Sequence, residues 1–582
     1  MIEFPLLADL TQNEVDVFRA SGNFDEQWYL NEYPDVAQSG IDPARHYLWL
    51  GKRIGRCASR SAFKRFYGVD LHWCIIATPH VLFIAHCLAR SLERHGWSVE
   101  IVMDPPLDFH HDYYIVLCAQ MFEVLPPGEK RIIYQLEQSA SSRWFGEKYL
   151  RDLENSLAVL DYSLQNIEFL SSRGISYPQV YYMPVGSSET YKNSVEFRKD
   201  IEILFYGDYK SSPRRRSMLD SLSGKFNVLR VDSIFGEDIK ELICRSKVVI
   251  NLHYYEGAQL ETPRIQECLS LGVPVVSEDT RDMGDYPSLN GAVAFFETGN
   301  VSAMAEALSS TLRAVDSKQD SLQSVVESGQ RRNNFMLDRA LMGLGILPTD
   351  SMEAFEAEPI ADGDIFALSL PETIERRRMF NSEIRTPDIR IFDGIRRSPG
   401  WIGCGMSYKY LCQSAYRSGV NHFTIVEDDV LYSADFERKI KCVNDYLNKK
   451  SGEWDIFSGV IAHLHDEVKV INVENFEGID FVTIDKMTST VFNIYGSRAI
   501  NMIAKWNPKD ENSQKNTIDR YLEGSNLRVV VAHPYIAGHR EELTSTLWGF
   551  ENTQYRDMIN ESERKLGELK RAWLNSAPLD AD

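Results

Sequence analysis

The segment YYEGAQLETPRIQECLSLGVPVVSE, residues 254–278, decides the fold class of much of the chain. Its middle predicts a helix that carries Glu261, Arg264 and Glu267 on one face, because these residues are spaced by three. The turn at 272–274 then leads into the apolar run VVSE, which predicts a buried strand. A helix that feeds a buried strand is the repeating unit of a parallel sheet covered by helices.

The same alternation of apolar, β-rich runs and amphipathic stretches extends from residue 68 to 345. Runs of this kind predict parallel strands covered on both faces, in two Rossmann-like halves at about 68–195 and 196–345. The polar segment SSETYKNSVEFRKD, residues 187–200, separates the two sets. The strand candidates are WCIIAT, VEIVMD, YYIVLCA, RIIYQLE, VYYMPVG, IEILFYG, VVINLHY and VPVVSE.

The remaining parts of the chain give an α/β protein of several domains. Residues 1–62 predict a small helical module, whose aromatic residues we interpret as a mini-core rather than a sugar platform. Residues 346–362 are acidic and predict a linker. A second large α/β domain follows at 363–550, with strands at DIFALSL, HFTIVED, WDIFSGV and RVVVAHP. The tail, 551–582, predicts a solvated terminal helix.

Charge and composition exclude several classes of partner. The 582 residues carry a formal net charge of −21, which disfavours binding to nucleic acid or to an anionic membrane. The nine cysteines lack the spacing of a disulfide framework or a zinc site, and the N-terminus lacks the pattern of a signal peptide. No apolar stretch is long enough to span a membrane. We therefore expect a cytoplasmic protein that meets any lipid-linked acceptor through a partner or by peripheral contact.

The helix in the opening segment is a candidate binding site for a phosphorylated ligand. Its carboxylates, Glu261 and Glu267, would hold hydroxyl groups while free N–H groups receive a diphosphate. Arg214 or Arg215 would neutralise that diphosphate, although three successive arginines equally suit a solvated helix start. His80 lies at a strand end, where it is either an acceptor-side base or a structural residue.

These residues resemble the GT-B glycosyltransferases, in which an acidic helix precedes a G-x-P-V-V turn and binds the nucleotide sugar. Further resemblance lies in IIYQLEQ, DYSLQNIEFL, YYMPVG and FYGDYKSSPRRR, so that it covers nearly all of 70–345. It implies that Arg214, Arg215, Glu261, Arg264 and Glu267 bind the donor. In the commonest version two glutamates are separated by seven residues, and Gln259 stands here at the first position.

The second large domain has a candidate metal site at HFTIVEDDV. In an extended strand Glu427 and Asp429 face one side and Asp428 faces the other, so that two carboxylates converge. Hard oxygen ligands suit Mg²⁺ or Mn²⁺ that also binds substrate phosphates. Taken alone, the pattern equally suits an acidic turn that caps the next helix.

The segments LPETIERRR, GCGMSYKYLCQSAYRSGV, EWDIFSG and HPYIAGHREELTS surround this motif. In this order they resemble glycosyltransferase family 25, the lipopolysaccharide and collagen galactosyltransferase group, over about 363–547. The resemblance implies a GT-A fold with an E-D-D version of the D-x-D motif. We assign Arg376, Arg378, Ser407 and Asp428 to donor binding, and His539 as a third metal ligand. One departure is Tyr408, since the family commonly has histidine after the serine.

The resemblances imply an inverting, metal-dependent transferase with a nucleotide-sugar donor, for which UDP is the expected nucleotide. Asp519 is the preferred base and Asp455 the second candidate, while a helix-dipole role for Asp519 is as acceptable. Two readings remain. Either both domains transfer sugars to a surface glycan, such as lipopolysaccharide, capsule or glycoprotein, or only the GT-A domain is active and the GT-B-like domain binds the acceptor or assists assembly.

Overall fold

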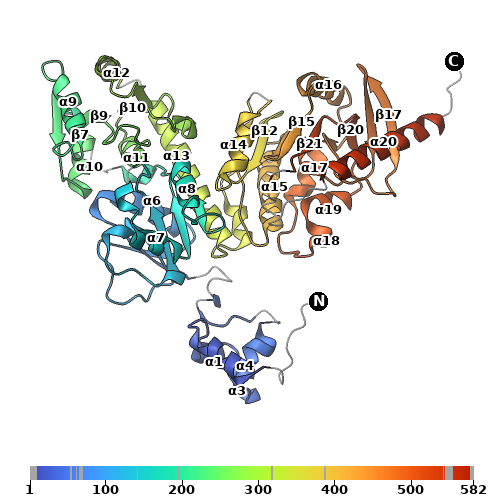
Figure 1. Ribbon diagram of the computed structural model, residues 1–582, viewed down its shortest axis with the longest axis horizontal. Coiled ribbons are helices and arrows are strands. Elements are labelled where there is room, and N and C mark those ends of the chain that lie inside the picture. Colours follow the sequence, from blue (N-terminus) through green and yellow to red (C-terminus); the bar gives the residue numbers. More distant parts are fainter. Residues whose placement is uncertain are drawn as a thin grey trace. The chain divides into compact units, whose positions relative to one another are not determined.

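The computed structural model describes residues 10–576 apart from 53–55, 61, 64–69, 141, 193–196, 316–318, 386–387, 542 and 544–554. Two compact units emerge, one of residues 1–341 with 345–348 and one of 342–344 with 349–582 (Figure 1). Most of the predicted boundary at 62–68, the boundary at 550–551 and part of the division at 187–200 lie outside the described residues. No helix within the described ranges is apolar enough over a sufficient length to cross a membrane.

The described part of the N-terminal module contains the short α-helices α1 to α4, each begun by its own capping residue or proline. Thr11 and Glu14 form a capping box on the first helix, and Asp25 and Asp42 cap the second and fourth. Phe24 and Tyr29 are buried in its core, which agrees with a mini-core. The helices are α1 (Gln12–Ala20), α2 (Glu26–Glu32), α3 (Pro34–Ser39) and α4 (Pro43–His46).

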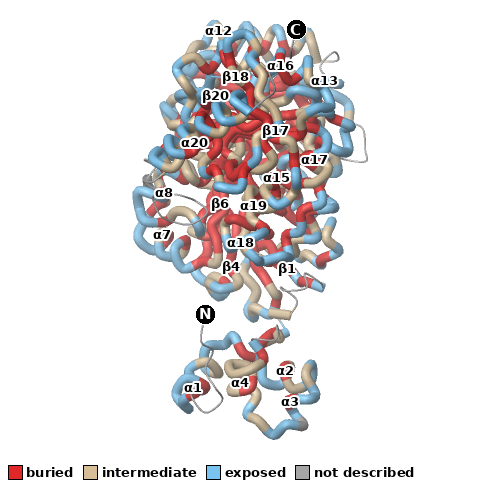
Figure 2. Tube along the Cα trace, turned by 90° about the vertical axis from the view of Figure 1, so that its right-hand side faces the viewer, coloured by how far each residue is buried: buried red, intermediate tan, exposed pale blue. Residues whose placement is uncertain are grey.

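The next part of unit 1 is a six-stranded parallel sheet in the order β2-β1-β3-β4-β5-β6. Strands β3 and β4 are buried along their whole length, and Figure 2 shows this burial near β4 and β6. The strands are β1 (His72–Ile76), β2 (Ser98–Val102), β3 (Tyr113–Leu117), β4 (Arg131–Gln135), β5 (Ala158–Asp161) and β6 (Val180–Tyr182). The main helices are α6 (Leu82–Glu93), α7 (Glu147–Glu154) and α8 (Leu164–Ser171).

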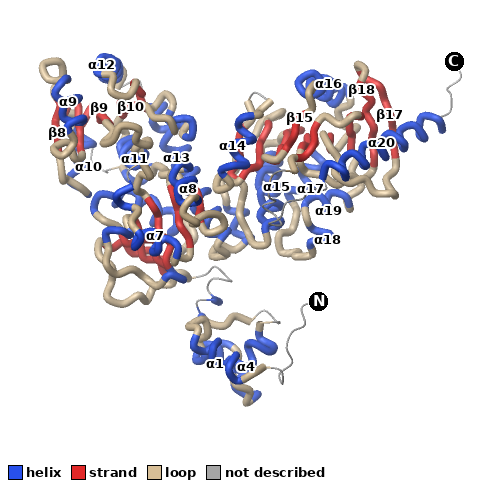
Figure 3. The backbone as a smooth tube through the Cα atoms, in the orientation of Figure 1, coloured by secondary structure: helices blue, strands red, loops and turns tan. Residues whose placement is uncertain are grey.

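A second parallel sheet follows in the order β11-β10-β9-β7-β8, so the fold class predicted for this region, paired Rossmann-like sheets, is confirmed (Figure 3). Its core contains Ile203, Phe205, Val248 and Ile250. The strands are β7 (Ile201–Tyr206), β8 (Val228–Val231), β9 (Ser246–Asn251), β10 (Val275–Glu278) and β11 (Val293–Phe296). The helices are α9 (Pro213–Ser221), α10 (Gly236–Arg245), α11 (Thr262–Ser270), α12 (Val301–Arg313) and α13 (Gln319–Gly343).

Unit 2 is an α/β structure around an eight-stranded mixed sheet in the order β13-β12-β14-β19-β16-β20-β18-β17, with a small two-stranded sheet, β15-β21. The strands are β12 (Ile365–Ser369), β13 (Arg390–Asp393), β14 (His422–Glu427), β15 (Val430–Tyr432), β16 (Ile456–Ser458), β17 (Val470–Phe476), β18 (Ile479–Ile484), β19 (Phe492–Gly496), β20 (Val529–His533) and β21 (Ala537–His539). The helices are α14 (Ile374–Ser382), α15 (Gly400–Arg417), α16 (Phe436–Lys449), α17 (Ser497–Ala504), α18 (Ser513–Asn516), α19 (Ile518–Glu523) and α20 (Tyr555–Ser576).

Two segments expected to be free of the core are packed onto unit 2. In the predicted linker, Phe355 is buried against Tyr410, whose hydroxyl donates to the carbonyl of Glu356. In α20, Leu566 is fully buried and Ser562 hydrogen-bonds Tyr535. The tail is a helix, as expected, and a few apolar residues attach both mainly charged segments to the rest of unit 2.

Candidate active sites

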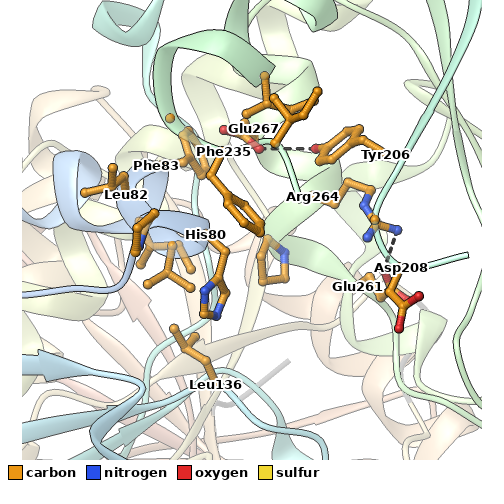
Figure 4. Close-up of a pocket in the computed structure, with 18 of the residues that line it drawn as sticks. His80, Leu82, Phe83, Leu136, Tyr206, Asp208, Phe235, Glu261, Arg264 and Glu267 are labelled. Carbon is orange, nitrogen blue, oxygen red and sulfur yellow. Dashed lines mark hydrogen bonds and ion pairs between the residues drawn. The ribbon is translucent and has the colours of Figure 1, made fainter. Parts of the chain in front are cut away.

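A pocket of about 590 Å³ lies between the two halves of unit 1. Figure 4 shows its two walls: His80, Leu82, Phe83 and Leu136 come from the first half, and the labelled residues from Tyr206 to Glu267 come from the second. All three predicted residues of the acidic helix, Glu261, Arg264 and Glu267, line this pocket. The position agrees with the general rule that ligands bind beyond the carboxyl ends of parallel strands.

Helix α11 begins later than the sequence predicted. Glu261 is its N-cap residue rather than part of the helix, and it makes no side-chain capping bond. Pro263 lies in the first turn, where its missing N–H leaves no intrahelical bond unmade. The carboxylate of Glu261 is therefore free to turn toward Arg264, at 2.6 Å, and Arg215, at 2.9 Å.

Glu261 is paired with two arginines, which keep its carboxyl group ionised in spite of burial. Burial by itself would raise the pKa of Glu261, but Arg264 and Arg215 outweigh it and lower that pKa. Two buried donor groups at the start of α11, Arg264 Nε and Thr262 Oγ1, have no hydrogen-bond partner among the residues described. Unpaired donors at a helix N-terminus are suited to an anionic ligand.

The two arginines predicted to meet the diphosphate have other contacts. Arg214 pairs with the buried Glu278 and donates to the carbonyl of His253 at 3.0 Å. Arg215 is buried and donates to the carbonyl of Leu252 as well as to Glu261. Of the three predicted arginines, Arg264 is the one that lines the pocket.

Gly207 allows this placement of Arg264. Its φ of +126° lies in the region that favours glycine, and a Cβ there would lie 2.9 Å from Arg264 Nη2. Tyr206 and Asp208, on either side, also line the pocket and were not predicted. The available signal was their position directly after a buried strand, within the motif FYGDYKSSPRRR from which only the arginines were taken.

Glu267 accepts hydrogen bonds from Tyr206 at 3.2 Å and Tyr191 at 3.4 Å. Burial raises the pKa of this carboxyl to about 7, although both tyrosines favour its charged form. Across the pocket, His80 Nε2 lies 3.6 Å from Cys118 Sγ, and burial lowers the pKa of His80. The pocket thus has carboxylates and an arginine on one wall and a histidine among apolar residues on the other.

A change of pH should reveal the cost of ionising Glu267. Folding raises its pKa above the unfolded value of about 4.3, so the folded state binds the proton more tightly and stability falls as pH rises from about 4 to about 7. Glu267→Gln should therefore raise the thermal midpoint relative to wild type above pH 7 but not near pH 4. Thermal melts of both proteins across this range measure the difference. The same difference at every pH, or an equal trend in the exposed Glu306→Gln, would contradict the assignment.

The predicted metal site of unit 2 is assembled by the small sheet β15-β21. This pairing sets Val430 opposite His539, and the N–H of Arg540 donates to the carbonyl of Asp429 at 2.9 Å. His539 Nε2 consequently lies 3.2 Å from Asp429 Oδ2. Burial would raise the pKa of Asp429, but His539 and Arg376 lower it well below its usual value.

The predicted alternation of the three acids stops one residue early. Strand β14 ends at Glu427, and Asp428 and Asp429 form a turn. Arg376, on α14, can therefore bind both aspartates, with 2.8 Å to Asp429. Glu427 instead accepts a hydrogen bond from Tyr408 at 3.0 Å, and burial followed by the charge of Asp429 raises its pKa to about 7. The tyrosine that replaces the expected histidine thus contacts the first acid directly.

Other predicted residues of this domain are placed differently. Ser407 is fully buried in α15, where its hydroxyl accepts from the N–H of Ile395 and donates to the carbonyl of Gly403. Arg378 is exposed on α14, the helix from which Arg376 faces the acids. Asp519 lies in the first turn of α19. It has a neighbour in common with the acids, because burial and then the charges of Glu427 and Asp519 raise the pKa of Cys404.

Asp455 lies at the wrong end of the sheet for the predicted base. It precedes β16, and its carbonyl accepts from the N–H of Gly496, which is paired with His422 at the start of β14. Glu427 is five residues further along β14, roughly 16 Å away. Arg498 and Arg528 bind Asp455 at 3.0 Å, and although burial would raise its pKa, Arg528 lowers it. The carboxylate is a structural anion rather than a candidate base, a difference that only strand register reveals.

A cation at the acids would need ligands from outside the chain. Within the described ranges, no group of three or more His, Cys, Asp or Glu side chains could hold a metal ion. One buried oxygen, Asp429 Oδ1, has no hydrogen-bond partner in the described part of the chain, and His539 lies beside the same carboxylate. Mg²⁺ is commonly held by one or two carboxylates plus substrate phosphates and water, so these residues fit such an ion in the presence of a diphosphate.

Comparison with known proteins gives a family match for part of unit 1. Residues 193–335 match the glycosyl transferase-like family, and this stretch contains β7 to β11 and the whole charged wall of the pocket. These residues therefore form a glycosyl transferase-like domain. No curated protein matches the chain.

Several solved structures resemble it at low identity. Sucrose-phosphate synthase from Thermosynechococcus elongatus is 13% identical over 47% of this chain and 98% of that chain, with a TM-score of 0.31. HepE from Anabaena, in complex with UDP and glucose, is 12% identical over 45% and 95%, also with a TM-score of 0.31. An alpha-glucosyltransferase in complex with UDP-glucose and DNA is 9% identical over 46% and 95%, with the same score.

Proposed function

We propose that unit 1 transfers a sugar from a nucleotide-diphosphate donor, UDP-linked, without a metal ion. The observation that carries this proposal is the pair of unpaired buried donors, Arg264 Nε and Thr262 Oγ1, at the start of α11, of which Arg264 belongs to the wall of the pocket. A diphosphate there would meet a guanidinium and the positive end of a helix dipole. Both stabilise the negative charge that develops on the leaving nucleotide. A bound metal ion can stabilise the same charge in other enzymes.

The remaining side chains of the pocket suit the other parts of the reactants. Glu261 and Glu267 are acceptors for hydroxyl groups of the sugar and ribose. The opposite wall, with His80 among Leu82, Phe83 and Leu136, faces the acceptor in this proposal. Arg214 and Arg215 act indirectly, because Arg215 holds Glu261 and Arg214 holds Glu278 beneath the site.

A second transferase activity, metal-dependent and inverting, is proposed for unit 2. The specific support is Asp429, which has one unpaired buried oxygen beside His539 and within an ion pair of Arg376. Mn²⁺ or Mg²⁺ bound there would neutralise the donor diphosphate. Arg376 and Asp428 would orient the donor, and Asp519 is the candidate base. The acceptor in both reactions is proposed to be a surface glycan such as lipopolysaccharide, capsule or glycoprotein.

In the competing proposal only unit 2 transfers a sugar, and unit 1 binds the acceptor or assists assembly. The two proposals differ in the metal requirement for nucleotide binding. Titration calorimetry of UDP in EDTA should give a dissociation constant of about 10 to 1,000 µM if unit 1 binds the donor. Uridine is the control, because it lacks the diphosphate. Binding of UDP only after addition of Mn²⁺ would instead favour the single-enzyme reading.

A further inference from the structure

Gln259 occupies the position at which the paired-acid pattern commonly has its first glutamate, but it has a different environment. It lies in the segment between β9 and α11 and is 2% exposed. Among the described residues, its hydrogen-bond partners lie in the first half of unit 1. The backbone N–H and carbonyl of Gln259 bond the side chain of Gln138, and the side-chain amide bonds Tyr162, Ser139 and Asn166.

The hydrogen-bond pattern requires an amide at position 259. Its Nε2 donates to Ser139 Oγ at 3.1 Å and to Asn166 Oδ1 at 2.9 Å, and its Oε1 accepts from the Tyr162 hydroxyl at 3.2 Å. The orientation of Asn166 is fixed, because its Nδ2 donates to Asp161 and to the carbonyl of Glu137 while its Oδ1 accepts from the N–H of Ser139. Asn166 Oδ1 can therefore only accept. An ionised glutamate at 259 would face it with a second acceptor.

The cluster of Gln259, Gln138, Ser139, Tyr162 and Asn166, here called the latch, adjoins the pocket. Gln138 and Tyr162 line it, and Gln259 is two residues before Glu261. We propose that Gln259 is a positioning residue that fastens the two halves of unit 1 at the separation the donor site needs. In this proposal the amide of Gln259 binds the first half of unit 1 and does not bind the sugar. The effect on donor affinity rests on the function proposed for unit 1, whereas the fastening does not.

The test compares Gln259→Glu with wild type by amide hydrogen exchange in the full chain. Two amides report on the latch: the N–H of Gln259, bonded to Gln138, and the N–H of Ser139, bonded to Asn166. We expect both to exchange about 10-fold faster in the variant, with strands β4 and β9 unchanged, because the bond to Asn166 Oδ1 cannot be replaced and a buried charge is added. The matched control is Gln165→Glu, which adds the same charge at an exposed position on α8.

A milder variant, Tyr162→Phe, removes one hydroxyl and keeps the proposal testable if Gln259→Glu does not fold. It should speed exchange of the Gln259 amide about 3- to 5-fold. Latch exchange as slow in both variants as in wild type, or equally faster in β4 and β9, overturns the proposal. UDP affinity in EDTA is measured beside it and should fall at least about 3-fold in Gln259→Glu. If wild type binds no UDP, the proposed function fails while the exchange result still decides the latch.

Discussion

Arg264→Lys is expected to bind UDP about 100-fold more weakly than wild type. The guanidinium is 2.6 Å from Glu261 and 2.6 Å from Asn251 Oδ1, its buried Nε has no partner among the described residues, and the residue lines the pocket. Lysine keeps the charge but cannot bond a carboxylate and a diphosphate together in one plane. Losing two charge-assisted hydrogen bonds accounts for about 3 kcal/mol, hence the factor of about 100.

Titration calorimetry in EDTA measures this difference without knowledge of the acceptor. Arg245→Lys is the matched control, since Arg245 lies in the same half and pairs with Asp200 and Glu241 at the surface. Circular dichroism should show both variants folded, because Arg215 still neutralises Glu261. An Arg264→Lys affinity within a factor of about three of wild type would remove Arg264 from the diphosphate site.

Asp429→Asn is expected to reduce metal-stimulated donor turnover by unit 2 on the order of 1,000-fold. Asparagine preserves the size of the side chain but removes the charge that His539 and Arg376 share. It also replaces one carboxylate oxygen by a donor group that a cation cannot use. UDP release from a UDP-sugar, with Mn²⁺ and with EDTA, measures the loss.

The control for this variant is Asp435→Asn, a half-exposed aspartate paired with Arg438 and Lys439 at the start of α16. Binding of UDP in EDTA should be unchanged in Asp429→Asn, since unit 1 is untouched. Mn²⁺-stimulated turnover that persists at the wild-type rate would refute both the metal site and the activity proposed for unit 2. Loss of EDTA-resistant binding would instead show that the substitution perturbs more than its own site.

The sequence predicted most strands of unit 1, because long β-branched runs buried on both faces can be recognised without a partner. It missed β5, β8 and β11, which have only four residues each, and β8 is not fully buried. In unit 2 it missed β13, β17, β18 and β19, of which only β17 is partly exposed along its whole length. The sequence also did not predict the three-residue strands β15 and β21, although their pairing brings Asp429 close to His539.

By itself, the sequence determined the α/β class, the helix of Arg264 and Glu267, and the acids at the end of β14, since each follows from local spacing and burial. Tertiary structure alone decided which groups these side chains contact. It paired Arg214 and Arg215 with internal carboxylates, left Arg264 at the pocket, and placed Asp455 at the end of the strands opposite to the acids. It also placed Gln259 in the contact between the two halves of unit 1. The physical reason is that a charge or amide binds whichever group the fold brings within about 3 Å, and spacing along the chain does not specify that group.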